Sequence, residues 1–406
     1  MANGLLSVEE ALAKLLGGAR AVTDVETVPT LAATGRVLAR PQRATINVPP
    51  LDNTSMDGYA VRAADCASGA ARLRVAQRIQ AGAVGRPLDA GTAARVFTGA
   101  PIPSGADAVV MQEQCEVVGD AVIINHTPRS GDWIRRAGED IRAGSMLLEA
   151  GTRLRAQEIG LAASVGLAAL PVARQFRVAL FSTGNELAMP GEPLPEGAIY
   201  NSNRFTLTGL LRLLGCEVED LGIVPDTYDA TRDALRQAAV ANDLILTSGG
   251  VSVGEEDHVK PAVTAEGRLD LWRIAIKPGR PLAFGAVRRT DGSEASFIGL
   301  PGNPVSSFVT FLLFVRPFVL RCQGVTRVEP RSFATRADFD WPKPDPRREF
   351  LRVKLNASGG LDLFPNQSSG VLTSTVWGDG VVDNAAKQVI KRGDMVRFLP
   401  FSELLY

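Results

Sequence analysis

The spacing of hydrophobic residues separates helical stretches from β-rich ones in the first half of the chain. Ser7 and Glu10 form an S-x-x-E capping box in front of apolar residues at helical spacing, which predicts a first helix. Two more helices are expected at residues 30–38 and 156–165. Between them, short apolar runs alternate with Gly/Pro turns, which is typical of strands. We therefore expect a mostly β domain at residues 45–140, inserted into a helical linking region formed by residues 1–44 and 141–175.

A strand–loop–helix pattern begins at residue 176 and repeats to about residue 326. Gly215 lies where a glycine commonly ends a helix, and Asn303 and Pro304 suit the N-cap and first turn of the last helix. Alternating strands and helices predict a doubly wound α/β domain with a parallel sheet at residues 176–326. The expected strands are residues 176–181, 216–222, 243–248 and 296–300, and the expected helices are residues 203–214, 229–241 and 305–315.

The last stretch of the chain is β-rich again. Short apolar runs are separated by Gly, Asn and Asp turns, which predicts a small β-barrel or sandwich at residues 327–406. The fold class is thus multidomain, with a central α/β domain, an inserted mostly β domain, a helical linking region and a C-terminal β-barrel.

Charge and composition narrow the function classes. Lys+Arg and Asp+Glu are equal at 44 each, so no basic field for nucleic acid or a membrane surface is expected. The longest apolar run, residues 308–315, is closed by Arg316 and Pro317 and falls short of the ~20 residues that span a bilayer. Four scattered cysteines and two histidines do not suit a zinc site. With no secretory pattern at the N-terminus, the sequence predicts a cytoplasmic protein with free thiols.

Three predicted strands end in glycine-rich loops, which should lie at one edge of the sheet. Glycine lets backbone N–H groups approach an anion, and ligands of open parallel sheets bind beyond the carboxyl ends of the strands. Neither GxxxxGK[ST] nor GxGxxG is present, which argues against a P-loop NTPase and a Rossmann dehydrogenase. We expect a phosphate-bearing small molecule to contact Ser182, Thr183, Gly184, Ser248, Gly249, Gly250, Ser252, Gly254, Pro301, Gly302, Asn303 and Pro304.

Acidic and basic residues follow these loops. Glu186, Asp226 and Asp257 could hold Mg²⁺ between their carboxylates and phosphate oxygens, although solvated N-cap residues look the same in a sequence. Lys277 and Arg280 occupy a turn fixed by two prolines and could bind an oxyanion, or they could be an ordinary solvated pair.

In the N-terminal half, polar residues cluster around Asp57, Thr98 and Asp140. Their spacing alone gives them no role, and turn formation is the default explanation for such Asp/Asn/Ser-rich segments.

The chain contains, in this order, the motifs DNTSMDGYA, RVFTGAPIPSGADAVVMQE, GEDI, FSTGNEL, SGGVSVGEED, IKPGRP and GLPGNPVS. Together they resemble those of the MoeA/gephyrin E-domain family of molybdopterin molybdenumtransferases, over essentially the whole chain. The family's activity is the last step of molybdenum cofactor synthesis, in which molybdate enters adenylylated molybdopterin and AMP is released with help from Mg²⁺. The dithiolene that binds the metal belongs to the substrate, which fits the absence of an obvious catalytic Cys or His.

The resemblance also implies roles for residues in both halves. It places Asp57 and Thr98 on the inserted domain facing the active site, and Asp140 in the same cleft. Glu186 would lie at the first loop, Asp226 and Asp257 would serve phosphates and metal, and Lys277 and Arg280 would hold molybdate or phosphate. The implied assembly is a homodimer in which the inserted domain of one subunit closes over the α/β domain of the other. A molybdopterin adenylyltransferase is a possible further partner.

Three positions depart from common forms of the pattern. The first motif reads NTSMDG where NSAMDG is frequent, Ala137 interrupts a basic run, and Arg280 stands where lysine is frequent. Arg280 keeps the charge with another donor geometry. Two alternatives stay open: a molybdopterin adenylyltransferase, which needs only the α/β domain, and a non-catalytic scaffold with the same fold.

Overall fold

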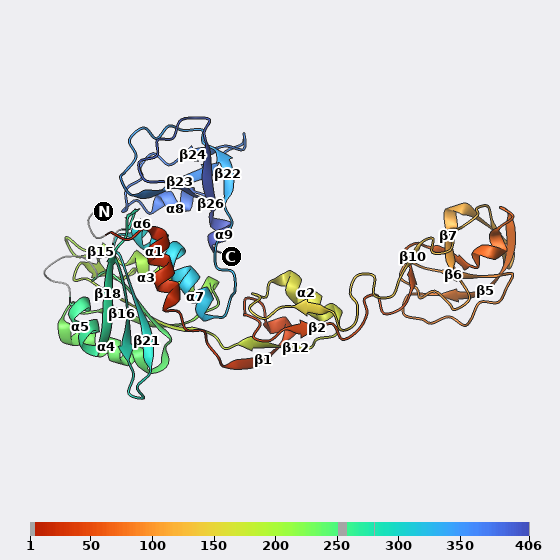
Figure 1. Cartoon of the computed structure of the whole chain (residues 1–406), viewed down its shortest axis with the longest axis horizontal. Coiled ribbons are helices and arrows are strands. Elements are labelled where there is room, and N and C mark those ends of the chain that lie inside the picture. The colour runs from red at the N-terminus through yellow and green to blue at the C-terminus, as the bar shows by residue number, and fades with distance from the viewer. Residues whose placement is uncertain (1–4, 251–257, 280, 406) are drawn as a thin grey trace.

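The computed structural model describes residues 5–250, 258–279 and 281–405. The chain forms an elongated molecule with an α/β body and a small β-barrel at one end, and a second β body at the other (Figure 1). A narrow arm of paired strands joins the two ends, and the chain runs through it once outward and once back. Both termini lie at the α/β end.

The α/β body is built on one sheet of six strands. Four neighbouring strands, β16, β13, β17 and β21, run parallel, as the sequence predicts. Two further strands, β20 and β18, continue the sheet antiparallel, which the alternation of strands and helices had not indicated. In sheet order the strands are β16 (Glu217–Val224), β13 (Arg177–Thr183), β17 (Leu244–Ser248), β21 (Glu294–Leu300), β20 (Pro281–Arg288) and β18 (Gly267–Arg273).

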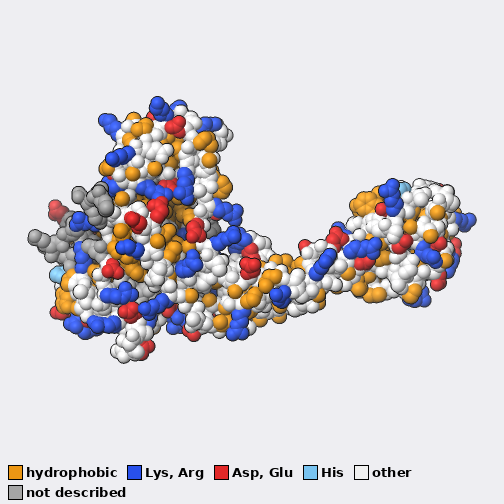
Figure 2. Space-filling view, viewed as in Figure 1, with side chains coloured by type: hydrophobic (Ala, Val, Ile, Leu, Met, Phe, Trp, Pro, Cys, Tyr) orange, Lys and Arg blue, Asp and Glu red, His pale blue; other side chains and the backbone are white. Residues whose placement is uncertain are grey.

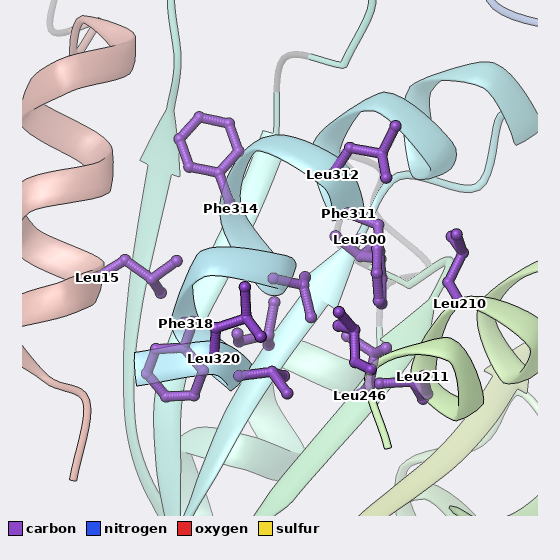
Figure 3. Close-up of a cluster of buried hydrophobic side chains, with 14 of the residues drawn as sticks. Leu15, Leu210, Leu211, Leu246, Leu300, Phe311, Leu312, Phe314, Phe318 and Leu320 are labelled. Atoms are coloured by element: carbon purple, nitrogen blue, oxygen red, sulfur yellow. The ribbon is translucent and has the colours of Figure 1, made fainter. Parts of the chain in front are cut away.

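Helices cover both faces of this sheet because strand side chains alternate between two hydrophobic clusters. Val178 and Leu180 of β13 point into one cluster, and Ala179 and Phe181 into the other. The first cluster is covered by α1 (Val8–Gly17), α3 (Ser202–Leu213) and the helix after β21 (Figure 3). The second is covered by α4 (Tyr228–Ala241) and α5 (Val259–Glu266). The doubly wound architecture and most predicted boundaries are confirmed.

The predicted helix ends behave as their sequence indicates at two sites. The capping box of α1 is formed, since the Ser7 hydroxyl accepts from the Glu10 N–H at 3.1 Å and the Glu10 carboxylate accepts from the Ser7 N–H at 2.8 Å. Gly215 follows α3 with φ +77°, the left-handed conformation expected there.

The helix expected at residues 305–315 continues to residue 322, so the predicted end at Arg316 and Pro317 is wrong. It consists of α6 (Pro304–Thr310), a π-helical turn (Phe311–Val315) and α7 (Arg316–Cys322). The wider turn lets Pro317 fall at the start of α7, where its missing N–H costs nothing. By length and composition Pro304–Cys322 could cross a membrane, but 89% of it is buried inside the protein, as in a core helix.

The arm contains little helix. Its strands are β1 (Val25–Pro29) paired with β12 (Ala169–Ala173), and β2 (Gln42–Arg43) paired with β11 (Met146–Leu148). The predicted helix α2 (Ala156–Ser164) is present. The helix expected at residues 30–38 is wrong: a single 3₁₀ turn (Thr30–Ala32) is followed by Gly35 in a left-handed conformation. Val37 and Leu38 then form β-bridges, so tertiary pairing overrides the helical spacing.

The far body is mostly β, as predicted. A six-stranded sheet is made of β7 (Ala108–Met111), β4 (Gly58–Val61), β6 (Thr92–Val96), β5 (Ala71–Ile79), β9 (Ala121–Ile124) and β8 (Cys115–Val118), in that order. A short ribbon of β3 (Asn53–Thr54) and β10 (Ile134–Arg135) joins it to the arm.

The C-terminal stretch closes into a small barrel, which confirms that prediction. Strand β24 pairs with β23, and Ala337, just after β22, bridges Leu361 of β24 to close the ring. The strands are β22 (Phe333–Arg336), β23 (Arg348–Leu355), β24 (Leu361–Leu363), β25 (Gly380–Asn384) and β26 (Met395–Pro400), with α8 (Thr373–Trp377) and α9 (Phe401–Leu405). Strand β19 (Ile276–Lys277) of the α/β body pairs with β23 and joins the two units.

Charges of both signs are interspersed over the face shown in Figure 2, at both ends of the molecule. This distribution follows the zero formal net charge of the sequence.

Candidate active site

A cavity of about 710 Å³ opens at the carboxyl ends of β13, β17 and β21. All three predicted glycine loops contribute to it, so the sequence correctly identified the edge of the sheet at which a ligand could bind. Residues from the barrel form the opposite wall. The lining residues are Thr183, Gly184, Glu186, Asp226, Gly249, Gly250, Lys277, Pro278, Gly279, Pro281, Pro301, Gly302, Asn303, Ser306, Arg347, Gln367, Ser368 and Ser369.

The second loop needs glycine because the backbone comes close to the end of β13. Gly249 and Gly250 have φ +94° and +64°, in the left-handed region. A Cβ on Gly250 would lie 2.8 Å from Thr183 Oγ1, and one on Gly249 would lie 2.8 Å from the Thr183 carbonyl oxygen. The Gly249 N–H donates to the Leu300 carbonyl at 3.0 Å, which connects this loop to the end of β21.

Thr183 presents an unsatisfied hydroxyl to the cavity. Its side chain is buried, and its Oγ1 has no hydrogen-bond partner among the residues that the structure describes. A buried hydroxyl without a partner has a desolvation cost that a bound ligand or ion would remove.

Several predicted contacts lie elsewhere than expected. Ser182 and Ser248 are buried below the cavity, with their hydroxyl oxygens 3.4 Å apart, because neighbouring strand residues alternate faces and Thr183 takes the cavity side. Asn303 occupies the N-cap position of α6 without a side-chain cap bond and lines the cavity instead. Pro304 begins α6 and is not among the lining residues. Four predicted residues, Ser252, Gly254, Asp257 and Arg280, lie outside the described residues.

Two cations meet on the barrel side of the cavity. Lys277 Nζ lies 3.3 Å from Asp345 Oδ2 and 3.3 Å from Glu349 Oε1. The Arg347 guanidinium contacts Asp345 through two bonds of 2.8 and 2.9 Å and holds the pKa of that carboxyl well below its usual range. Glu349 is almost fully buried, where it also accepts from Trp341 Nε1 at 2.8 Å.

The predicted acidic residues form the other side. Glu186 is exposed at the mouth of the cavity and Asp226 is half-buried on its wall. The described residues contain no cluster of three His, Cys, Asp or Glu side chains that could hold a metal by themselves. Two carboxylates facing a phosphate are nevertheless enough for Mg²⁺, which commonly keeps waters and binds through one or two carboxylates plus phosphate oxygens.

Asp57 and Thr98 lie in the far β body and meet each other rather than the cavity. Asp57 Oδ1 accepts from the Thr98 N–H at 2.7 Å and from its hydroxyl at 2.8 Å. These two donors, with the positive field of Arg95, hold the pKa of the Asp57 carboxyl below its ordinary value. Asp140 is exposed near the base of this body, and its N–H donates to the Val48 carbonyl at 3.0 Å. Within one chain the arm separates this group from the cavity (Figure 1).

Sequence reasoning missed the barrel's contribution to the cavity. Arg347 lies in a segment that reads only as a charged, proline-rich loop, and residues 367–369 belong to a short Gln-Ser-Ser stretch with no periodic pattern. Their place depends on how two units pack, for which the doubled arginine at the start of β23, Arg347 and Arg348, was the visible signal.

Comparison with known proteins identifies relatives over the whole length. Residues 6–166 match the family described as MoeA N-terminal region (domain I and II), residues 179–321 a probable molybdopterin binding domain, and residues 334–401 the MoeA C-terminal region (domain IV). A molybdopterin molybdenumtransferase of Haemophilus influenzae is 38% identical over 99% of this chain and 100% of its own. A molybdopterin molybdenumtransferase 2 of Mycobacterium tuberculosis is 38% identical over 82% and 84%.

Among solved structures, two molybdopterin biosynthesis MoeA proteins from Pyrococcus horikoshii resemble this chain throughout. One is 31% identical with a TM-score of 0.78, covering 98% of this chain and 99% of its own. The other is 28% identical with a TM-score of 0.82, covering 98% and 100%.

Proposed function

Since this chain belongs to the MoeA family of molybdopterin molybdenumtransferases, we propose that its cavity is the place where molybdate enters adenylylated molybdopterin and AMP is released. The chain is an enzyme of molybdenum cofactor biosynthesis, and this reaction is the final step of that synthesis. The adenylyltransferase alternative is not favoured, because relatives that match over the full length are named as the transferase.

One observation supports the proposal most directly: glycine loops, two cations and two carboxylates face a single cavity. The glycine loops offer backbone N–H groups to a phosphate of the adenylylated substrate. Lys277 and Arg347 offer ammonium and guanidinium donors to an oxyanion such as molybdate. With substrate positioned in this way, the protein contributes orientation and electrostatic stabilisation, while the dithiolene sulfurs of the substrate receive the metal.

The residues present also fit a magnesium ion. Glu186 and Asp226 would supply carboxylate oxygens, and the Thr183 hydroxyl, which has no partner among the described residues, would supply a further oxygen. When bound, Mg²⁺ would neutralise phosphate charge next to these carboxylates. Asp257, the third carboxylate of the predicted set, lies outside the described residues.

The distant Asp57–Thr98 pair supports a homodimeric site. We propose that the β body of one subunit covers the cavity of the other, so that Asp57, Thr98 and Asp140 complete a site opposite Glu186. The elongated subunit suits such an arrangement, because the arm carries these residues away from the cavity of their own chain.

Three further assignments go with this proposal. We place the boundaries of the four structural units at residues 1–44 with 141–175, 45–140, 176–326 and 327–406. The strand pairings and hydrophobic clusters support those of the far body and the barrel, whereas α1 packs into the core of the α/β body. The enzyme would work in the cytoplasm, where its four free cysteines stay reduced. A molybdopterin adenylyltransferase would act before it, as the supplier of adenylylated substrate.

The reaction can be tested with purified protein and adenylylated molybdopterin. AMP is expected to appear only when molybdate is added, because in the proposed reaction water cleaves the phosphoanhydride bond and AMP leaves only as the metal enters the dithiolene. Release of AMP at the same rate without molybdate would contradict the transferase reaction, and ATP consumption would indicate the adenylyltransferase instead.

A further inference from the structure

A fully buried arginine lies behind the barrel wall of the cavity. Arg352 of β23 is 1% exposed and donates to Ser374 Oγ at 3.2 Å, to the Phe350 carbonyl at 3.3 Å and to the Ser368 carbonyl at 3.2 Å. Burial lowers the pKa of this guanidinium to about 10, so it remains protonated at neutral pH. All three of its acceptors are neutral, and among the described residues no carboxylate forms an ion pair with it.

An unpaired buried charge is costly. Removing a cation from water without a counter-charge costs several kcal/mol, so buried arginines normally contact a carboxylate. Neutral carbonyls recover only part of that loss. The cavity is a place where an anion could offset this charge, because Ser368, whose carbonyl accepts from Arg352, is one of its lining residues.

Arg352 also fixes the wall by its main chain. Its N–H donates to Gln367 Oε1 at 2.9 Å, and Gln367 Nε2 donates back to the Arg352 carbonyl at 3.0 Å. On the other side, the Ser369 carbonyl accepts from the Val305 N–H at the start of α6 at 3.0 Å. Residues 367–369 are therefore held between the barrel and the third glycine loop.

We propose that Arg352 is a positioning residue for anion binding: it holds residues 367–369 as the cavity wall, and its buried charge, which no carboxylate among the described residues pairs with, is offset by the anion that the cavity takes. This inference rests on the proposed function only in requiring an anionic substrate. The inference assigns a role to a cation that contacts no ligand. Arg352 acts through its hydrogen bond to the Ser368 carbonyl and through the electrostatic field of its guanidinium.

The test uses AMP as the probe and adenosine as its neutral counterpart. In Arg352→Met we expect AMP to bind about tenfold more weakly, since a charge at this depth acts through a lower dielectric than water. Adenosine should bind with the same affinity as in the wild type. Arg352→Lys keeps the charge and should recover most of the AMP affinity. In the full reaction, Arg352→Met should raise KM for adenylylated molybdopterin more than it lowers kcat.

A second buried arginine supplies the matched control. Arg316 of α7 is 6% exposed, donates to the carbonyls of Val328 and Glu403 at 2.9 and 3.0 Å, and also has a pKa lowered by burial to about 10. It does not line or support the cavity wall. Arg316→Met should lower the melting temperature about as much as Arg352→Met while leaving AMP affinity unchanged.

Some outcomes would overturn the proposal. Equal weakening of AMP binding in Arg316→Met and Arg352→Met would reduce Arg352 to a structural role. Equal weakening of AMP and adenosine in Arg352→Met would remove its electrostatic part. If Arg352→Met does not fold, Gln367→Ala releases the wall while keeping the charge: weaker AMP binding would support the positioning part, and unchanged binding would refute it. The wild type could bind AMP more tightly than adenosine and yet fail to release AMP from adenylylated molybdopterin when molybdate is added. In that case the proposed function fails while this inference stands.

Discussion

Lys277 and Arg347 reach the cavity from different parts of the chain, and one carboxylate, Asp345, contacts both. Lys277 could be predicted because two prolines and a glycine fix its turn, which is a local property of the sequence. Arg347 and residues 367–369 could not, because their position depends on the packing of the barrel against the α/β body. At the residue scale, the sequence therefore predicts residues whose position depends on their own turn, and it does not predict contacts between separate units.

The hydrogen bonds of Thr98 predict a pH effect. Asp57 accepts from the Thr98 N–H and hydroxyl, which favour the ionised carboxylate and lower its pKa. That stabilisation is present above the ordinary pKa and is lost as the pH falls through the lowered one. Thr98→Val removes the hydroxyl donor and raises the pKa, so the acidic limb of kcat/KM should move to higher pH.

Thr98→Ser keeps the hydroxyl and is the control, with an acidic limb close to that of the wild type. A pH profile of kcat/KM for the three proteins decides the matter. An unshifted limb in Thr98→Val would show that ionised Asp57 does not limit the reaction at low pH.

At the element scale, hydrophobic periodicity predicted the α/β strands and helices well, because each is a long segment with one dominant pattern. It failed where segments distant in the sequence determine the local structure. Residues 30–38 have helical spacing but pair with the returning pass of the arm, and the helix from Pro304 passes through Pro317 because a π-helical turn precedes it. The hydrophobic pattern of the antiparallel strands β18 and β20 does not differ from the pattern expected of a parallel strand.

Helix α1 is attached to the barrel by charged contacts. Arg348 donates to Glu9 near the start of α1 and, at 2.5 and 2.6 Å, to both oxygens of Asp383, which is 4% exposed at its side chain. Arg397 also contacts Asp383, at 3.1 Å. Arg348→Ala leaves this carboxylate with one weaker partner and should lower the free energy of unfolding by about 2 kcal/mol, as measured by urea denaturation.

The exposed pair of Arg177 and Glu217 is a suitable comparison for that measurement. Both side chains are about half exposed, and Arg177→Ala should change the stability by less than about 0.5 kcal/mol. If the two variants have equal stability, the contact at α1 contributes nothing beyond an ordinary surface ion pair.

At the scale of the whole molecule, the two halves of the proposed site lie at opposite ends of one chain. This predicts complementation between inactive variants. Asp57→Ala and Glu186→Ala should each be inactive, yet co-expression should restore about a quarter of the wild-type activity, because half of the dimers are mixed and each mixed dimer holds one intact site.

The double variant Asp57→Ala/Glu186→Ala, co-expressed with either single variant, is the control and should stay inactive. Activity is measured as molybdate-dependent AMP release from the purified mixture. A mixture of the two single variants as inactive as its components would mean that both residues serve the same chain's site, or that they do not act together.

The paired strands of the arm fix its length. Residues 25–29 on the outward pass are hydrogen-bonded in register to residues 169–173 on the return, so β12 cannot slide by one residue without turning its buried Leu170 and Val172 outward. The lengths of both paired strands therefore fix how far Asp57 lies from the α/β body. A longer or shorter arm would require matched insertions or deletions in both passes, and a change in only one would tilt the far body rather than extend it.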